Sequence, residues 1–70
     1  MPDMVYVDSV SIEAVGYDAD SQELFVRFVS GETYRYDGVP STVAEAFLAA
    51  PSKGSYFNRE IKPAYQYAKV

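Results

Sequence analysis

Two strand-like runs joined by a short turn are the feature that most constrains this fold. The runs LFVRFV (residues 24–29) and TYRY (residues 33–36) are rich in β-branched and aromatic side chains, and Ser30 and Gly31 lie in the segment that joins them. Runs of this kind, separated by a short turn that contains glycine, predict an antiparallel hairpin. The chain is therefore expected to build on an antiparallel sheet.

The length of this turn decides which face of the hairpin carries the tyrosines, because a shift of one residue moves every side chain to the opposite face. A two-residue turn sets Arg27 opposite Tyr34, and the tyrosines then leave the aliphatic face. A three-residue turn over residues 29–31, with Gly31 as a left-handed bulge residue, sets Val26 opposite Tyr34. We favour the bulged turn because it gathers four large side chains on one face and leaves the arginine outside. Those four side chains belong to Leu24, Val26, Tyr34 and Tyr36.

The rest of the chain completes a small α+β domain. Residues 10–17 and residues 64–70 alternate as strands do. Residues 41–50 carry apolar side chains at helical spacing, and residues 52–62 predict a short second helix or turn. We expect a three-stranded antiparallel meander, a helix, a short second helix or turn, and a final C-terminal strand (β-β-β-α-(α)-β), with the helices on one face of the sheet. The other face is expected to be open to water or to a partner.

The second helix is expected to contribute to the core. Ser52 is a favourable residue for its N-terminal cap, and Phe57 and Ile61 lie four residues apart on its inner face. Gly54 weakens this helix by about 1 kcal/mol relative to alanine. Pro63 ends it.

The chain lacks the two residue types that enzymes use most often. Its 70 residues make one small domain, residues 1–70, and they include no His and no Cys. No disulfide and no Ser-His or Cys-His pairing can form. The acidic loop with Asp18, Asp20 and Glu23 lacks the glycine and the glutamate that an EF-hand loop requires at fixed places. We expect no enzymatic activity, no catalytic residue, no metal site and no cofactor.

Neither a signal peptide nor a membrane span is predicted. The first residues carry acids where a signal peptide carries Lys or Arg, and no apolar run approaches the roughly 20 residues that span a bilayer. A chain without Cys is also usual in a reducing compartment. We expect a cytoplasmic protein without a membrane partner.

Charge is distributed unevenly along the chain. Residues 1–45 hold nine acidic and two basic side chains, whereas residues 46–70 hold one acidic and four basic ones. The basic part also carries tyrosines, and cations interleaved with aromatic rings are typical of single-stranded nucleic-acid binding. The candidate nucleic-acid-binding residues are Lys53, Tyr56, Asn58, Arg59, Lys62, Tyr65, Tyr67 and Lys69. Tyr34 and Tyr36 are core residues if the turn is bulged and stacking platforms if it is not.

Two observations favour a purely structural interpretation of the basic part. Lysines on an edge strand discourage pairing with other chains, and lysines on a helix keep its surface solvated. The pI of about 4.5 also differs from the basic pI expected of a dedicated nucleic-acid binder.

Several short motifs in order resemble the KTSC domain, a family named after the C-terminus of some lysyl-tRNA synthetases that also occurs as a single-domain bacterial protein. The sequence YRY matches the central Tyr-x-Tyr of the family, and Val39-Pro40 follows it. The segment from Ser52 to Ile61 matches the pattern Ser-x-Gly-x-Tyr-Phe-Asn-x-x-Ile. Pro51, just before this segment, departs from the family. The resemblance implies no established activity, and it implies RNA binding only through the association with the synthetase.

Two functions of different class therefore follow as hypotheses. The first is an RNA-binding module, with tRNA as the suggested partner, which uses the basic and aromatic C-terminal part. The second is a protein-protein interaction module that uses the open sheet face or an edge strand. The oligomeric state stays open, because an exposed edge strand can also pair across a two-fold axis.

Overall fold

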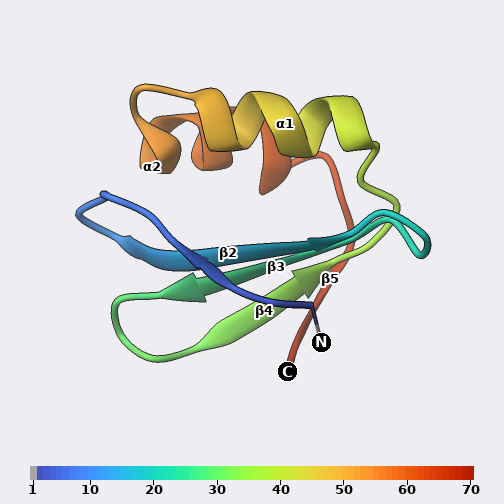
Figure 1. Cartoon of the computed structure of the whole chain (residues 1–70), viewed down its shortest axis with the longest axis horizontal. Helices are drawn as coiled ribbons and strands as arrows, with labels where there is room; N and C mark the ends of the chain where they lie inside the picture. The colour runs from blue at the N-terminus through green and yellow to red at the C-terminus, as the bar shows by residue number, and fades with distance from the viewer. Residues whose placement is uncertain (1) are drawn as a thin grey trace.

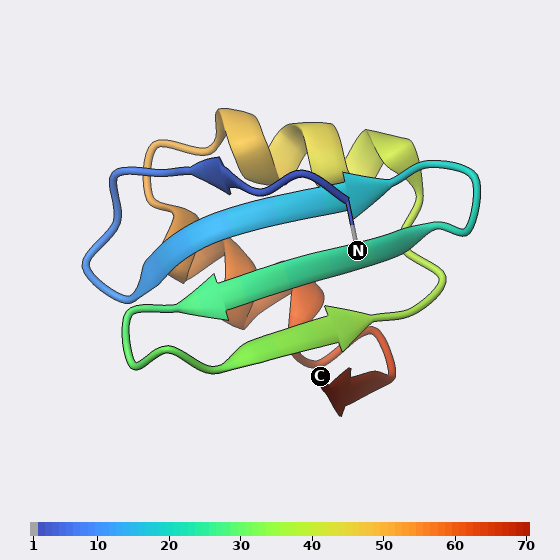
Figure 2. The same ribbon diagram turned by 60° about the horizontal axis from the view of Figure 1, so that its bottom comes forward.

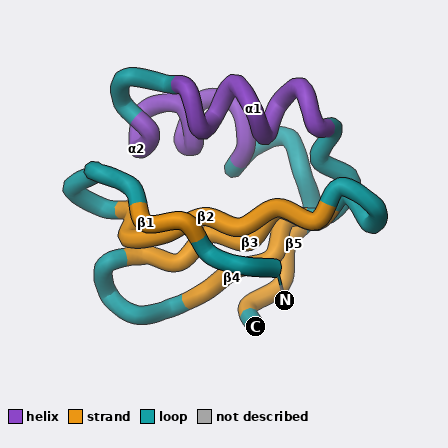
Figure 3. Tube along the Cα trace, in the orientation of Figure 1, coloured by secondary structure: helices purple, strands orange, loops and turns teal. Residues whose placement is uncertain are grey.

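An antiparallel sheet forms one layer of the molecule, and a helical layer covers one of its faces (Figures 1 and 3). The computed structural model describes residues 2–70. The strands follow one another across the sheet in chain order: β1 (Val5–Tyr6), β2 (Ile12–Asp18), β3 (Glu23–Phe28), β4 (Thr33–Tyr36) and β5 (Tyr67–Lys69). The helical layer holds α1 (Ser41–Ala49), α2 (Lys53–Tyr56) and the π-helical turn η1 (Phe57–Ile61). Within residues 2–70, no helix is long and apolar enough to cross a membrane.

Four strands precede the helices, so the prediction of a three-stranded meander was wrong by one strand. The additional strand, β1, has two residues, and it pairs Val5 with Val15 and Tyr6 with Ala14. A two-residue strand whose side chains are both exposed shows no alternation of apolar and polar residues, and this is why the sequence pattern did not predict it. The α+β class and the final strand are as expected.

The N-terminal segment partly covers the sheet face that was expected to be open. It crosses the strands on the side away from the helices (Figure 2). Gly16 makes this close approach possible, because a Cβ at that position would lie 2.7 Å from Met4 Sδ and 3.1 Å from the carbonyl oxygen of Asp3. The expectation of an open second face therefore needs correction.

The β3–β4 turn has the predicted bulged form. Gly31 has a φ of 100°, its N–H donates to the carbonyl of Phe28 at 2.8 Å, and the N–H of Phe28 donates to the carbonyl of Glu32 at 2.8 Å. This turn pairs Val26 with Tyr34 and Leu24 with Tyr36. Both tyrosines consequently lie on the face that carries the aliphatic side chains, toward the helices.

Replacement of Gly31 by alanine is expected to destabilise the protein by about 1–2 kcal/mol, because a side chain makes this left-handed conformation unfavourable. The measurement is urea unfolding followed by circular dichroism. Ser30→Ala, in the same exposed turn, is the control and should change the free energy of unfolding by less than about 0.5 kcal/mol. Equal stability of the two variants would contradict the turn geometry.

The core lies between the helix-facing side of the sheet and the helical layer. Phe47 of α1 is fully buried at its centre, and Phe57 and Ile61 of η1 are buried beside it, as predicted for the inner face of the second helix. The sheet contributes Ile12, Val15, Leu24, Val26 and Tyr36.

The second helical segment spans nearly the predicted residues, but it changes its winding partway. Ser52 caps α2 as expected, since its Oγ accepts a hydrogen bond from the N–H of Ser55 at 3.4 Å. The N–H of Lys62 then donates to the carbonyl of Phe57 at 2.9 Å, which is the five-residue spacing of a π-helix. Gly54 lies against the β1–β2 loop, and a Cβ there would be 3.1 Å from the hydroxyl oxygen of Ser11. This close approach explains why a glycine occupies this position despite its low helix propensity.

Candidate nucleic-acid interface

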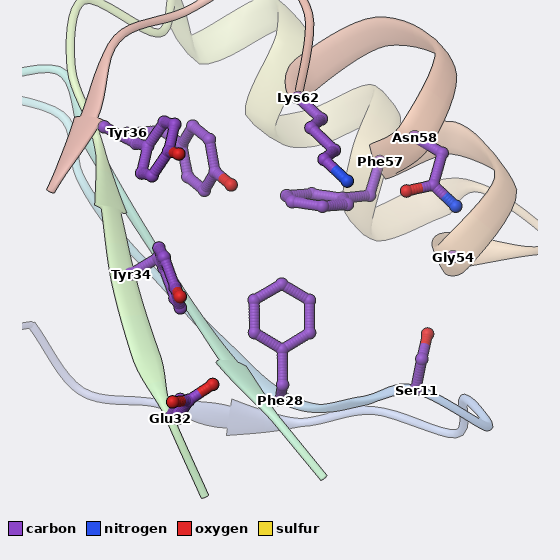
Figure 4. A pocket seen from close by; sticks show the side chains of 10 residues that line it. Ser11, Phe28, Glu32, Tyr34, Tyr36, Gly54, Phe57, Asn58 and Lys62 are labelled. Carbon is purple, nitrogen blue, oxygen red and sulfur yellow. The ribbon is translucent and has the colours of Figure 1, made fainter. Parts of the chain in front are cut away.

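A groove of about 420 Å³ runs between the β4–β5 side of the sheet and η1 (Figure 4). Half of its lining residues are aromatic, and they come from strands and helix alike. These rings belong to Phe28, Tyr34, Tyr36, Phe57 and Tyr67. Polar groups at its margin come from three separate parts of the chain, namely the β1–β2 loop, the β3–β4 turn and η1.

The strand register brings three tyrosines together at the edge of the sheet. Tyr36 pairs with Tyr67 across β4 and β5, and the ring of Tyr67 lies 5.5 Å from that of Tyr36 and 5.6 Å from that of Tyr34, measured between centroids. Tyr36 is 3% exposed, whereas Tyr67 is 58% exposed. The outermost ring of this set is therefore accessible, and the innermost belongs to the core.

Phe57 joins the tyrosines to the helical layer. Its ring meets those of Phe28 and Tyr36 edge-on, each at 5.4 Å between centroids. Edge-to-face contacts are a favourable geometry for aromatic pairs, and they fix the orientation of both rings. Burial raises the pKa of Tyr36, and the neighbouring hydroxyl groups of Tyr67 and Tyr34 raise this pKa further. The hydroxyl of Tyr36 therefore remains uncharged at neutral pH.

Charged side chains of opposite sign mark two ends of the groove (Figure 4). Glu32, in the β3–β4 turn, accepts a hydrogen bond from the ammonium of Lys69 at 2.9 Å. This bond is the main cause that raises the pKa of Lys69. Lys62, at the end of η1, points its ammonium into the groove beside the ring of Phe57 (Figure 4). Within residues 2–70, this ammonium forms no ion pair. The exposed Asn58 lies on the same turn.

A second groove of about 390 Å³ continues from the first. The two share Ser11, Gly54 and Asn58, and the second is lined further by Lys53 and by serines of the β1–β2 and α1–α2 loops. Asn58 therefore lies where the two grooves join.

The structure brings five of the sequence-predicted residues into the first groove and separates the others. The residues in this groove are Tyr34, Tyr36, Asn58, Lys62 and Tyr67. Lys69 contacts its margin through Glu32, and Lys53 lines the second groove, where its ammonium donates to the carbonyl of Ala50 at 3.1 Å.

Three predicted residues lie elsewhere. Arg59 pairs with Glu60 at 2.9 Å and lies 5.7 Å from the ring centre of Tyr56. The ring of Tyr56 also stacks on that of Phe47, at 5.8 Å between centroids. Tyr65 is half-buried and packs against the core.

Sequence reasoning assigned Phe57 to the core alone and missed three further polar or aromatic residues of the groove. Phe28 continues the alternation of Leu24 and Val26, so the bulged register contained the signal for its position. Ser11 and Glu32 lie far from η1 in sequence, and only the packing of their loops against the helical layer brings them near it.

The sheet face away from the helices carries paired charges rather than an apolar surface. Arg27 pairs with Glu13 at 2.8 Å, and Arg35 pairs with Asp37 at 2.8 Å and with Glu23 at 3.5 Å. The hydrogen bond from Arg35 to Asp37 is the main cause that raises the pKa of the guanidinium. The N-terminal segment covers another part of this face (Figure 2).

Comparison with known proteins identifies the family of the chain. The KTSC domain model matches residues 8–67. An uncharacterised protein of Stutzerimonas stutzeri is 43% identical over 67 residues, which are 94% of each chain. A lysine–tRNA ligase of Nostoc is 42% identical over 59 residues, and these cover 84% of this chain but 10% of the ligase. The crystal structure of a KTSC domain protein from Yersinia pestis superposes with a TM-score of 0.92 and 36% identity over 97% of this chain and 96% of that one. The chain belongs to the KTSC domain family.

Proposed function

We propose that this protein is a small non-enzymatic module that binds single-stranded RNA, such as an unpaired part of tRNA, at the groove between β5 and η1. The observation that carries the proposal is the unpaired ammonium of Lys62 pointing into a groove surfaced with aromatic rings. Modules that bind single strands combine these two features, because phosphates attract cations and bases stack on rings. Lys53 lies on the same helical segment and adds positive charge to the adjoining second groove.

Two further observations support this proposal. Lysine–tRNA ligases, whose name states that they act on tRNA, contain a region similar to this chain. The amino-acid sequence has no His and no Cys, and within residues 2–70 no group of three or more acidic side chains is placed to hold a metal ion. The lack of the two side chains that enzymes use most often favours binding over catalysis.

RNA binding is expected to be weak and sensitive to salt. With about three phosphate contacts, the logarithmic salt slope for a single strand is about −2, so a fourfold increase in salt lowers the affinity by roughly tenfold or more. The measurement is a fluorescence-anisotropy titration of the full chain against labelled tRNA and labelled single-stranded RNA at two salt concentrations. Lys62→Glu should abolish measurable binding, because it replaces the unpaired ammonium of the groove by a carboxylate that repels phosphate.

A matched control separates this local effect from net charge. The double variant Thr42→Glu/Ala46→Glu makes the same change in net charge at exposed positions of α1. Its RNA affinity should be within about twofold of that of the unchanged protein, because salt screens the repulsion between the distant carboxylates and the RNA. Absence of binding to either RNA at low salt and high micromolar protein would overturn the proposal. The protein-protein interaction hypothesis, with an edge strand as the contact, would then take its place.

A further inference from the structure

The first groove is the right size for one base rather than for a longer segment of RNA. Its volume of about 420 Å³ lies at the lower end of the range for small-ligand sites. Phe28, Tyr34 and Phe57 surround it on three sides (Figure 4). The exposed ring of Tyr67 also lines it, 5.6 Å from the ring of Tyr34 between centroids. Because every base has a π-face, such walls favour an unstacked base and do not select which one.

Polar groups at the margin provide the selection. The amide of Asn58 and the hydroxyl of Ser11 have no hydrogen-bond partner among the residues that the structure describes. Figure 4 shows both groups at the same side of the groove. An asparagine amide presents one donor and one acceptor next to each other, which complements the amino group and ring nitrogen of adenine.

The charged side chains determine at which end of the groove the phosphate next to this base lies. Lys62 marks the end of the groove at which a phosphate is stabilised, whereas the Glu32 carboxylate at the other end is paired with Lys69, and this neutral pair attracts no phosphate. The carboxylate of Glu32 is already held by Lys69, so it is less available to accept from the amino groups of guanine or cytosine. A cationic ligand would meet Lys62, and this argues against the alternative use of an aromatic groove as a cation-binding cage.

From this arrangement we infer that the groove binds one unpaired adenine of a single-stranded RNA, with Asn58 bonded to the edge of the base and Lys62 bound to the adjoining phosphate. This inference rests on the RNA-binding function proposed above and names the base that the site selects. Asn58 is accordingly the specificity-determining residue, whereas Lys62 acts on any sequence.

The test compares labelled oligoadenylate, oligocytidylate and oligouridylate of equal length in anisotropy titrations with the full chain at one salt concentration. Oligoadenylate should bind roughly tenfold more tightly than the other two, within the range for one bidentate contact between an amide and a base. Asn58→Ala should remove this preference and leave the affinity for oligocytidylate and oligouridylate unchanged. Thr42→Ala, at an exposed position of α1, is the control and should leave all three affinities unchanged.

Each other outcome has a distinct meaning. Equal, salt-sensitive binding of the three oligonucleotides would overturn the inference and leave RNA binding intact. An adenine preference that survives in Asn58→Ala, with the fold verified by circular dichroism, would overturn the role of Asn58. Failure of all three oligonucleotides and of tRNA to bind at low salt would overturn both the inference and the proposed function.

Discussion

Replacement of Phe47 by alanine is expected to unfold a large fraction of the protein at room temperature. The side chain is 0% exposed and lies at the centre of the core, between α1, η1 and the sheet. Truncation of a buried phenylalanine to alanine costs about 3–5 kcal/mol of stability, because the apolar ring is no longer buried in the core and a cavity is left behind. A chain of this length has a free energy of unfolding of about 4–10 kcal/mol, so the expected loss is comparable with the total stability. Urea unfolding followed by far-UV circular dichroism measures this change.

The neighbouring residue provides a matched control. Leu48 lies on the same helix and is 39% exposed, so Leu48→Ala should cost less than about 1 kcal/mol. Phe47→Leu keeps most of the apolar volume and should remain folded, which permits a measured free energy even if the alanine variant cannot be purified. A loss below about 1 kcal/mol in Phe47→Ala would contradict the placement of this side chain at the centre of the core.

The hairpin and the core could be predicted because local rules determine them. Gly31 satisfies a turn that needs a positive φ, and this single residue sets the register that turns both tyrosines of YRY toward the helices. The four-residue spacing of Phe57 and Ile61 similarly indicates a buried helix face. In both cases the signal lies within a few residues of the feature that it predicts.

The groove could be predicted only in part because distant segments form it. Asn58 and Lys62 carry a local signal, since they lie among cations and aromatic residues of one helical segment. Ser11 and Glu32 carry none, because their positions depend on how two loops pack against the helical layer. The π-helical winding of η1 also lacks a propensity signal, and it shifts the register of every residue after Phe57.

The charge pattern alone also could not show which cations of the C-terminal part form ion pairs. Four cations in the C-terminal part suggested one basic face, but Lys69 is held by Glu32 and Arg59 by Glu60. Ion pairs between exposed groups are weak, so these cations can still exchange partners. Lys62 differs from them because its ammonium faces aromatic rings instead of a carboxylate.

Replacement of Tyr67 by alanine is expected to weaken RNA binding by roughly five- to a hundredfold, the range measured when a base loses its stacking partner. Tyr67 is 58% exposed and is the accessible member of the three tyrosines, so its removal affects the groove more than the core. Tyr67→Phe retains the ring and should bind nearly as well as the unchanged protein. The measurement is the anisotropy titration with single-stranded RNA, accompanied by urea unfolding of each variant.

Tyr6 offers a control of the same residue type on the opposite edge of the sheet. Tyr6 lies on β1, away from the groove, and is 72% exposed. Its ring centre lies 5.8 Å from the guanidinium carbon of Arg27. Tyr6→Ala removes a tyrosine ring that is even more exposed and should leave RNA affinity unchanged, because Tyr6 does not line the groove. Comparable losses in the two variants would indicate a general effect on stability or charge rather than stacking. Tyr67→Ala could also bind RNA as well as the unchanged protein while Lys62→Glu fails to bind. This result would mean that RNA is held by phosphate contacts without a stacked base, and the assignment of the groove to a base would then be wrong.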